Sequence, residues 1–315
     1  MDLKAFWLGW RRDIVRFVVF CLVALAVGVF INHAKSGVHH RLAHLLPSGS
    51  LDGLTSGLDF DAPAGPRRTG KPWTYRAHLN AGQSVWVRDM RGGITVEPAR
   101  SDTLEVTAVK SFSGSDPGSV RVVAVPSSDG IAICALWEDE EGDGEKGHCG
   151  PGDVYKPGSA RDNDVGVQFT VGLPRGTSIR ATTVTGAVRV AGATAPVVAG
   201  TVDGDVVAET MKGPLQAYSV NGSVHATVRG FADTGAVKLT TMNGSVTLEL
   251  AASVDATVSA NTINGAIKSD FPLTTTGKLV AHHAAGSIGA GGRRVELTAV
   301  NGSVRLKRIG PPTQR

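Results

Sequence analysis

The sequence has few aromatic residues: phenylalanine, tryptophan and tyrosine make up 5% of its 315 positions. Outside one apolar segment near the N-terminus, it also lacks any long stretch with the periodicity of an amphipathic helix. Glycine, in contrast, is abundant, at 40 positions. Short strands with tight corners leave little room for large rings, so this composition predicts an all-β fold.

Beyond its first 41 residues the sequence also lacks net charge. The whole chain has a formal charge of +4, and residues 1–41 contain six of its 32 Lys and Arg residues but only two of its 28 Asp and Glu residues. The remainder therefore holds 26 residues of each sign. A basic excess confined to one terminus predicts no nucleic-acid partner.

Residues 14–31, IVRFVVFCLVALAVGVFI, form a long apolar run with a single charge, at Arg16. A run of this length can cross a bilayer as a helix. Basic residues are more frequent before the run than after it, which orients the N-terminus toward the cytoplasm. The basic residues are Lys4, Arg11, Arg12 and Arg16 before and within the run, and Lys35 and Arg41 after it. We therefore predict a cytoplasmic tail and signal-anchor over residues 1–34, in an inner or cytoplasmic membrane, with the C-terminal domain periplasmic or extracellular.

Three alternatives remain for this N-terminal segment. It could be a cleaved secretory signal, although Ile31–Ala34 contains no A-x-A cleavage site. Arg11–Arg16 loosely resembles a twin-arginine export motif, and a buried core helix is the third alternative. Residues 35–71 are rich in Pro, Gly and Ser and predict a flexible linker, in which His40 and His44 are either solvated or a metal-binding pair.

The sequence has three cysteines, of which Cys21 lies in the apolar run. Cys134 and Cys149 bracket a stretch rich in Asp, Glu and Gly. Outside the cytoplasm they are expected to form a disulfide that closes this loop, with free or metal-bound thiols as the alternative. The acidic residues do not follow the calcium-loop pattern, so a solvated loop is favoured over a calcium site.

A five-residue pattern, with glycine at its centre and apolar residues at both ends, recurs along the second half of the sequence. The copies are centred on Gly186, Gly204, Gly222, Gly244, Gly265, Gly286 and Gly302, and an outlying copy on Gly92. Successive glycines from 186 to 302 are 18, 18, 22, 21, 21 and 16 residues apart. A period near 20 residues is typical of a repeat architecture.

In four copies an asparagine precedes the glycine: Asn221, Asn243, Asn264 and Asn301. Both residue types tolerate a left-handed backbone, so each copy predicts a sharp corner. The apolar residues two before and two after each glycine are expected to face one interior. After the corner, apolar and polar residues alternate, as in Val224, Ala226 and Val228, which predicts a strand with one buried face.

Like corners at near-constant spacing favour a right-handed parallel β-helix, or β-solenoid, over residues 72–308, with a Cys-bracketed loop at 134–149 and a tail at 309–315. An antiparallel sandwich or propeller is the alternative, because Asn-Gly is also a hairpin signal. The end coils of a solenoid need caps, and the polar segment from Arg305 onward is a candidate.

Residues 72–308 resemble the bacterial putative-adhesin repeat family, a domain of unknown function built of V-N-G-[SD]-[VI] coils. The resemblance rests on the seven downstream units, on residues 162–169 (DNDVGVQF) before Leu173, and on Cys134 with a later Cys149. Thr185, Asp203 and Ala285 depart from the pattern by replacing its asparagine. The resemblance implies a β-solenoid at the cell envelope and supplies no catalytic residue.

The sequence does not predict an enzyme, a cofactor or a metal site. Asp203 and Asp205 flank a corner glycine and could act together on a polysaccharide, but no sequence feature supplies a cleft for them. His282 and His283 are better explained as solvent-facing residues than as a base or a metal site. We therefore predict an envelope module that binds a glycan or a protein. The alternatives are self-association, a structural or envelope-stress regulatory role through a membrane protein partner, and a polysaccharide-acting enzyme.

Overall fold

The computed structural model describes residues 66–138, 147–152, 154–160, 162–231, 235–276 and 282–309. The chain divides into two compact units, Met1–Ala62 and Pro63–Arg315, and all described residues belong to the second. Among them, no helix has the length and apolar character needed to cross a bilayer. The predicted membrane span at 14–31 lies outside the described residues, as do most of the linker and the acidic centre of the Cys-bracketed loop.

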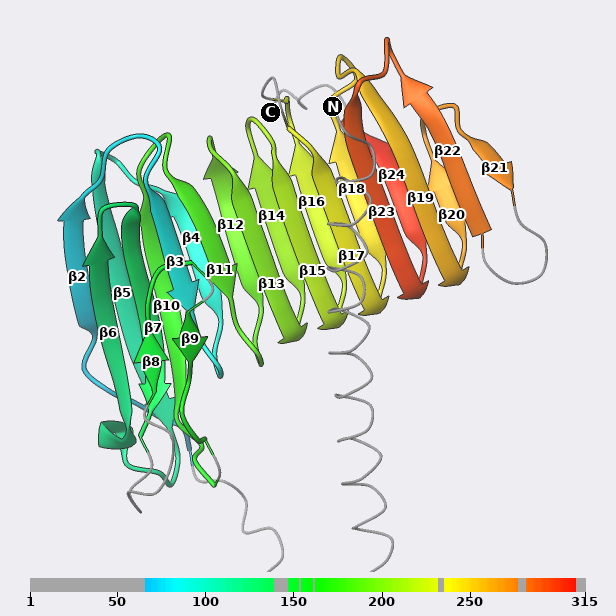
Figure 1. Cartoon of the computed structure of the whole chain (residues 1–315). Coiled ribbons are helices and arrows are strands. Elements are labelled where there is room, and N and C mark those ends of the chain that lie inside the picture. Colours follow the sequence, from blue (N-terminus) through cyan, green and yellow to red (C-terminus); the bar gives the residue numbers. More distant parts are fainter. Residues whose placement is uncertain are drawn as a thin grey trace, which may run out of the picture. The chain divides into compact units, whose positions relative to one another are not determined.

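The described residues form two eleven-stranded sheets around one core, which confirms the predicted all-β class (Figure 1). In spatial order, sheet A contains β1 (Arg68–Thr69), β5 (Thr103–Phe112), β10 (Gly166–Leu173), β4 (Ile94–Pro98), β12 (Val188–Ala193), β14 (Val206–Thr210), β16 (Val224–Val228), β18 (Val246–Leu250), β24 (Val304–Arg308) and β20 (Ile267–Ser269), with β2 (Trp73–His78) also paired to β5.

Sheet B contains, in spatial order, β6 (Val120–Ser127), β7 (Gly130–Trp137), β3 (Ser84–Arg88), β11 (Ser178–Thr182), β13 (Val197–Asp203), β15 (Leu215–Asn221), β17 (Val237–Asn243), β23 (Arg293–Asn301), β19 (Ala256–Asn264), β22 (His282–Ile288) and β21 (Thr274–Thr276). A short hairpin of β8 (His148–Cys149) and β9 (Tyr155–Lys156) and a 3-10 turn at Pro117–Ser119 complete the described elements.

In the middle of the molecule each coil is one strand of sheet B, a corner, and one strand of sheet A. Strands of successive coils pair in parallel, with Leu215 opposite Val237 in sheet B and Val224 opposite Val246 in sheet A. These four side chains are at most 1% exposed. Burying an aliphatic side chain of this size stabilises the fold by roughly 2 kcal/mol, so the stacked rows provide the core of the solenoid.

At the C-terminal end, the coils are not stacked in sequence order. The last coil, β23–β24, lies between β17–β18 and β19–β20, and it pairs in parallel with both. Figure 1 shows β23 in red between the yellow β17 and the gold β19. The chain therefore leaves one coil position open, forms β19–β22, and then returns to fill that position.

The N-terminal end has the same kind of arrangement. Coil β3–β4 forms first in sequence, and β7 and β10 pair in parallel with its strands on one side while β11 and β12 pair on the other. Antiparallel strands then close both ends of the stack: β6, β5 and β2 at this end, and β22 and β21 at the other. The polar segment expected to be a cap is instead β24, an inner strand of sheet A.

The structure corrects two further predictions. The residue two positions after a corner glycine is buried, as in Val224, except for the partly buried Ile267 in the last coil position. The residue two positions before the glycine points outward, with Val184 40% and Ile263 47% exposed. Gly286 is not a corner. It lies within β22, paired antiparallel with Val258, because this segment belongs to the end cap.

Candidate functional site: the outer face of sheet B

The corner glycines allow one coil to approach the next closely. A Cβ on Gly222 would lie 1.9 Å from the carbonyl oxygen of Gly204, and a Cβ on Gly302 would lie 1.8 Å from that of Gly244. Equivalent contacts run through one stack. Its corners are Gly92, Gly186, Gly204, Gly222, Gly244, Gly302 and Gly265, in spatial order. Gly186, Gly204, Gly222 and Gly302 also have positive φ. At Gly244 and Gly265, only the close approach of the neighbouring coil requires a residue without a Cβ. The outlying copy at Gly92 is therefore part of this stack.

At five of these seven corners, a buried hydroxyl three residues before the glycine binds the corner to its neighbour. Thr241 Oγ1 donates to the carbonyl of Gly222 at 2.7 Å, and Ser219 Oγ donates to that of Gly204 at 2.8 Å. Thr183, Thr201 and Thr262 make the same bond at 3.0, 2.9 and 2.7 Å. In coil β23–β24 this position is Ala299, which has no hydroxyl. These buried bonds replace water on carbonyls that would otherwise be unsatisfied.

The predicted asparagines form an exposed amide ladder along the same edge. Asn221 Nδ2 donates to Asp203 Oδ1 at 2.6 Å, and the next three amides each donate to their neighbour at 2.8 Å. The order of the next three is Asn243, Asn301 and Asn264. These polar side chains therefore bond to the adjacent coil, and their role at this edge is structural.

The two aspartates considered for catalysis also bond to neighbouring coils. Asp203 accepts the bond from Asn221, and Asp205 Oδ1 accepts the backbone N–H of Ser223 at 2.8 Å. His283 Nδ1 lies 2.7 Å from Oδ1 of Asn261. In the described part of the chain, no three His, Cys, Asp or Glu side chains gather as a metal site.

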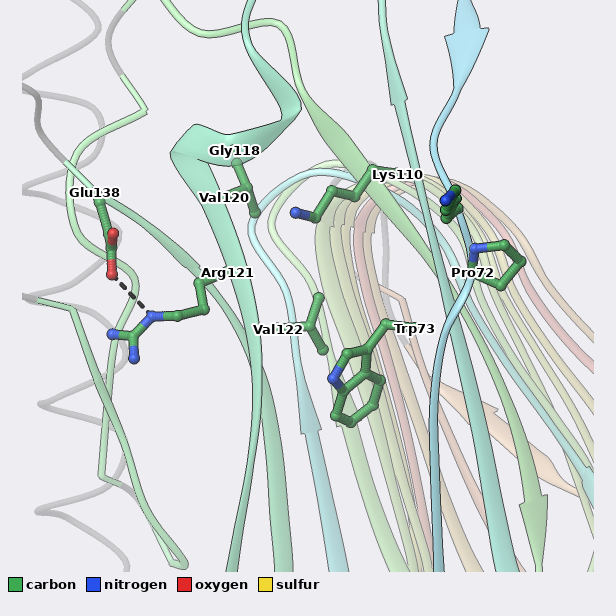
Figure 2. Close-up of a pocket in the computed structure, with 9 residues that line it drawn as sticks. Pro72, Trp73, Lys110, Gly118, Val120, Arg121, Val122 and Glu138 are labelled. Atoms are coloured by element: carbon green, nitrogen blue, oxygen red, sulfur yellow. Dashed lines mark ion pairs between the residues drawn. The ribbon is translucent and has the colours of Figure 1, made fainter.

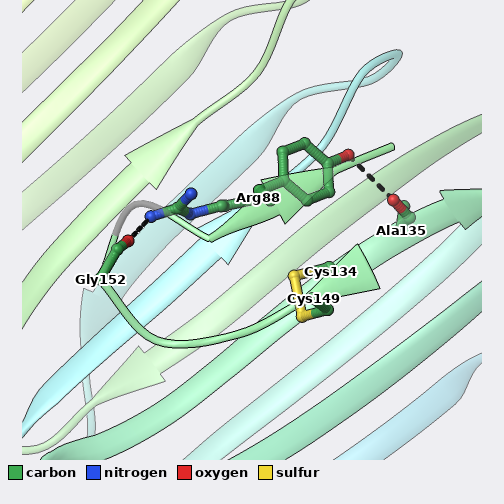
Figure 3. The surroundings of a disulfide bond; sticks show 6 residues. Arg88, Cys134, Ala135, Cys149 and Gly152 are labelled. Atoms are coloured by element: carbon green, nitrogen blue, oxygen red, sulfur yellow. Dashed lines mark hydrogen bonds between the residues drawn. A yellow bond between two sulfur atoms is a disulfide. The ribbon is translucent and has the colours of Figure 1, made fainter. Parts of the chain in front are cut away.

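The disulfide between Cys134 and Cys149 joins β7 to the β8–β9 hairpin, on the outer face of sheet B (Figure 3). The hairpin is also held by Tyr155, whose hydroxyl donates to the carbonyl of Ala135 at 2.9 Å, and by Arg88, whose guanidinium donates to the carbonyl of Gly152. Burial raises the pKa of the Tyr155 hydroxyl. This hairpin therefore covers the β7 and β3 end of the face.

Asp89 lies beside this hairpin, three residues before Gly92, where other coils place a hydroxyl donor. The residue is 1% exposed, and Oδ1 accepts the backbone N–H groups of Met90 and Arg91. No hydrogen-bond donor among the described residues reaches its Oδ2. Burial raises the pKa of this carboxyl to about 7, against the two backbone hydrogen bonds that lower it.

A groove of about 390 Å³ opens at the N-terminal end between the edge strands β2 and β6 (Figure 2). Trp73, stacked on Tyr75 with ring centroids 5.9 Å apart, lines it together with Val122. Two of its three basic groups have partners: Arg121 pairs with Glu138 at 2.8 Å, and Lys110 Nζ donates to the carbonyl of Pro117 at 2.7 Å. Lys71 is the third. The groove therefore lies at the N-terminal end of the two sheets and does not offer a ligand an array of unpaired charges.

The outer faces of the two sheets differ in charge. On sheet A, outward side chains form ion pairs such as Arg229–Glu209 at 2.7 Å and Lys307–Glu249 at 4.0 Å. On sheet B, the two outward rows nearest the corner carry no charged residue between β11 and β19. We call these rows the uncharged face; its residues are Val184, Val202, Val220, Met242, Val300 and Ile263 in the first row and Thr182, Gly200, Tyr218, Thr240, Thr298 and Asn261 in the second.

Apart from the asparagines beside it, this face is not predicted from the sequence. The signal was present in the strand alternation: Leu215, Ala217 and Ser219 point inward, so Tyr218 and Val220 must point outward. The outward valines were assigned to the core because they are apolar and close to the corner.

The Toastrack DUF4097 family model matches residues 160–307 of this chain, which bears out the predicted resemblance to a putative-adhesin repeat family. The match contains the corners from Gly186 to Gly302 and begins after the β8–β9 hairpin. A comparison with curated proteins found no significant match.

Solved structures that are similar to this chain include three putative adhesion proteins. A putative cell adhesion protein from Clostridium sporogenes ATCC 15579 is 12% identical, with 76% of this chain and 100% of that chain covered and a TM-score of 0.40. A putative adhesin from Bacteroides fragilis NCTC 9343 is 10% identical, with 76% and 97% covered and a TM-score of 0.24. A putative adhesin from Parabacteroides merdae ATCC 43184 is 9% identical, with 76% and 97% covered and a TM-score of 0.24.

Proposed function

We propose that this chain, whose residues 160–307 match the Toastrack model, is a membrane-anchored binding module without catalytic activity that presents the uncharged face of sheet B to a ligand at the cell envelope. One observation carries the proposal. The buried hydroxyls and the corner asparagines of the repeat bond to neighbouring coils, whereas the two rows of the uncharged face present partly exposed apolar and hydroxyl side chains.

The absence of catalysis is supported by the aspartates at the Gly204 corner. A glycosidase needs two carboxyl groups across a cleft. Asp203 and Asp205 instead lie in ladders on an open edge, each bonded to the next coil.

The anchored location is supported by the sequence of residues 14–31 and by the basic residues before it. In cells, the full chain should remain with membranes after an alkaline carbonate wash. Protease added outside the cytoplasmic membrane should remove the domain that contains Cys134 and Cys149. A domain protected until the membrane is dissolved would contradict this orientation.

Binding is tested with the full chain in detergent and purified envelope fragments. Co-sedimentation should be saturable. It should fall strongly for Val220→Lys, which places a charge on the uncharged face. The matched control is Thr227→Lys on the outer face of sheet A, because both residues are partly exposed strand positions. Equal loss in both variants, or no binding of the parent protein, would contradict the proposal.

A further inference from the structure

Tyr218 lies flat across Gly200. The two residues are paired on adjacent strands β15 and β13, in the second row of the uncharged face. A Cβ placed on Gly200 would lie 2.2 Å from Cζ, 2.4 Å from Cε2 and 2.6 Å from Cε1 of the Tyr218 ring. Because these three ring atoms are nearly equidistant from that point, the ring covers Gly200 with one face, and its other face is directed outward.

The residues beside this ring in its own row are neutral and hold hydrogen-bonding groups, while Lys238 lies in the next row, opposite Gln216 on β17. Thr240 is beside Tyr218 in the same row, and Thr182 is beside Gly200. Gln216 lies exposed two residues before Tyr218 on the same strand. Hydroxyl and carboxamide groups donate and accept hydrogen bonds, while an aromatic face offers apolar contact area with little loss of side-chain freedom.

We propose that Tyr218 and its neighbours form a stacking platform for a neutral glycan. The apolar face of a sugar ring would pack on the tyrosine, and its hydroxyls would bond to the flanking Thr240 and Gln216 side chains. This inference rests on the proposed function and names the class of ligand for that face.

The stack geometry favours a linear polysaccharide over a single sugar. Adjacent strands of a sheet are about 4.8 Å apart, so the rows of the face run along the stack at regular intervals. Beyond Tyr218 the row continues with Thr240, Thr298 and Asn261, all neutral hydrogen-bonding residues. An extended glycan laid along the row would meet a similar group at each coil.

The charges that flank the face favour a neutral ligand over an anionic one. The next row of outward side chains, farther from the corner than the Tyr218 row, holds Arg180, Lys238 and Glu296. These charges lie on separate strands and are of both signs. An anionic polymer binds to a continuous basic track, which this row does not provide.

The experiment uses the full chain in nanodiscs and titrates cello-, chito-, malto- and xylo-oligosaccharides, with polygalacturonate as the charged comparison. At least one neutral oligosaccharide should bind saturably, and more tightly as its length increases. Tyr218→Ala should weaken that binding by about ten-fold or more, as is typical for removal of a central aromatic contact.

Two variants separate ring loss from misfolding. Gly200→Ala adds a methyl where the ring lies, and it should weaken binding while the melting temperature stays close to that of the parent. Tyr218→Phe retains the ring and should bind nearly as the parent does. Tyr75→Ala, the same substitution as Tyr218→Ala at the far end of the stack, is the matched control and should have no effect on binding.

Four outcomes would overturn this inference: no neutral oligosaccharide binds the parent, polygalacturonate alone binds, Tyr218→Ala binds normally, or Tyr218→Ala dissociates a dimer without changing glycan binding. If envelope fragments still bind the parent while every oligosaccharide fails, the glycan assignment falls and the binding function stands. If neither binds, both fall.

Discussion

The outer faces of sheets A and B are built by the same repeat unit, yet they carry different side chains. On sheet A the outward residues include Glu209, Glu249 and Lys307, whose ion pairs keep that face charged and solvated. On sheet B the two rows next to the corner are free of charge, and Val184 and Ile263 are among the most exposed apolar residues of the described chain. A large exposed apolar surface is more often an interaction site than a surface that contacts only water.

The contrast also runs along sheet B itself. Its β7 and β3 end is covered by the disulfide-linked β8–β9 hairpin, so Arg88 is 6% exposed although it lies in the same row as Tyr218. Beyond the hairpin, the row remains partly exposed. The molecule thus covers one end of this face with its own chain and leaves the rest available.

The largest expected effect separates the inward and outward valines of one repeat unit. Val224→Asp would bury a carboxylate at a position that is 0% exposed, which should cost several kcal/mol and unfold the domain. Val220→Asp lies on the uncharged face and should change stability by less than about 1 kcal/mol. Urea unfolding followed by circular dichroism gives both values. Equal destabilisation would show that the first row is part of the core.

The corners were predictable because Asn-Gly fixes the turn. The buried row after them was predictable because apolar and polar residues alternate there without interruption, so only one set can face the core. The phase before the corner was misjudged. Val220 is apolar and near the glycine, but Ser219 points inward to bind the carbonyl of Gly204, which turns Val220 outward.

The position of the last coil could not be predicted from its sequence. The unit at Gly302 has the same corner as those at Gly244 and Gly265, so it can stack between them as well as after them. The choice depends on β21 and β22, whose antiparallel pairing occupies the outer edge of β19. Nothing in the degenerate unit at Gly286 shows this pairing in advance.

The next largest expected effect is the pH dependence of stability that Asp89 causes at the covered end of sheet B. Asp89 has its pKa raised by burial from 3.8 to about 7, so the folded state holds its proton at pH values where the unfolded chain has lost it. Its contribution to stability is therefore greatest below pH 4, declines as pH rises from about 4 to 7, and is lost above. The decline is on the order of 4 kcal/mol.

Asp89→Asn supplies a neutral side chain at every pH and should remove this decline. The measurement is the free energy of unfolding of both proteins at pH 5 and pH 8. Compared with the parent, the variant should be relatively more stable at pH 8 than at pH 5. Parallel pH profiles would show that Asp89 is not the group responsible. Arg88 and Tyr155 are nearby, but both keep the same charge over this range.

A smaller effect compares two adjacent threonines of β17. Thr241 is buried and donates to the carbonyl of Gly222, whereas Thr240 lies on the uncharged face. Thr241→Val should cost about 1–2 kcal/mol, because it leaves a buried carbonyl without its donor. Thr240→Val serves as the control and should be nearly neutral for stability. A neutral Thr241→Val would mean that the hydroxyl ladder does not hold the coils together.

The smallest expected effect is on the charged face. Glu209→Gln removes the ion pair with Arg229, whose two side chains are 34% and 47% exposed. A pair this accessible to water should contribute less than about 1 kcal/mol, and less at high salt. Thermal unfolding at low and high ionic strength measures the contribution. A loss well above that limit, unchanged by salt, would make the charges of sheet A structural. The difference between the two outer faces would then reflect the needs of folding and would no longer distinguish a solvated face from a binding face.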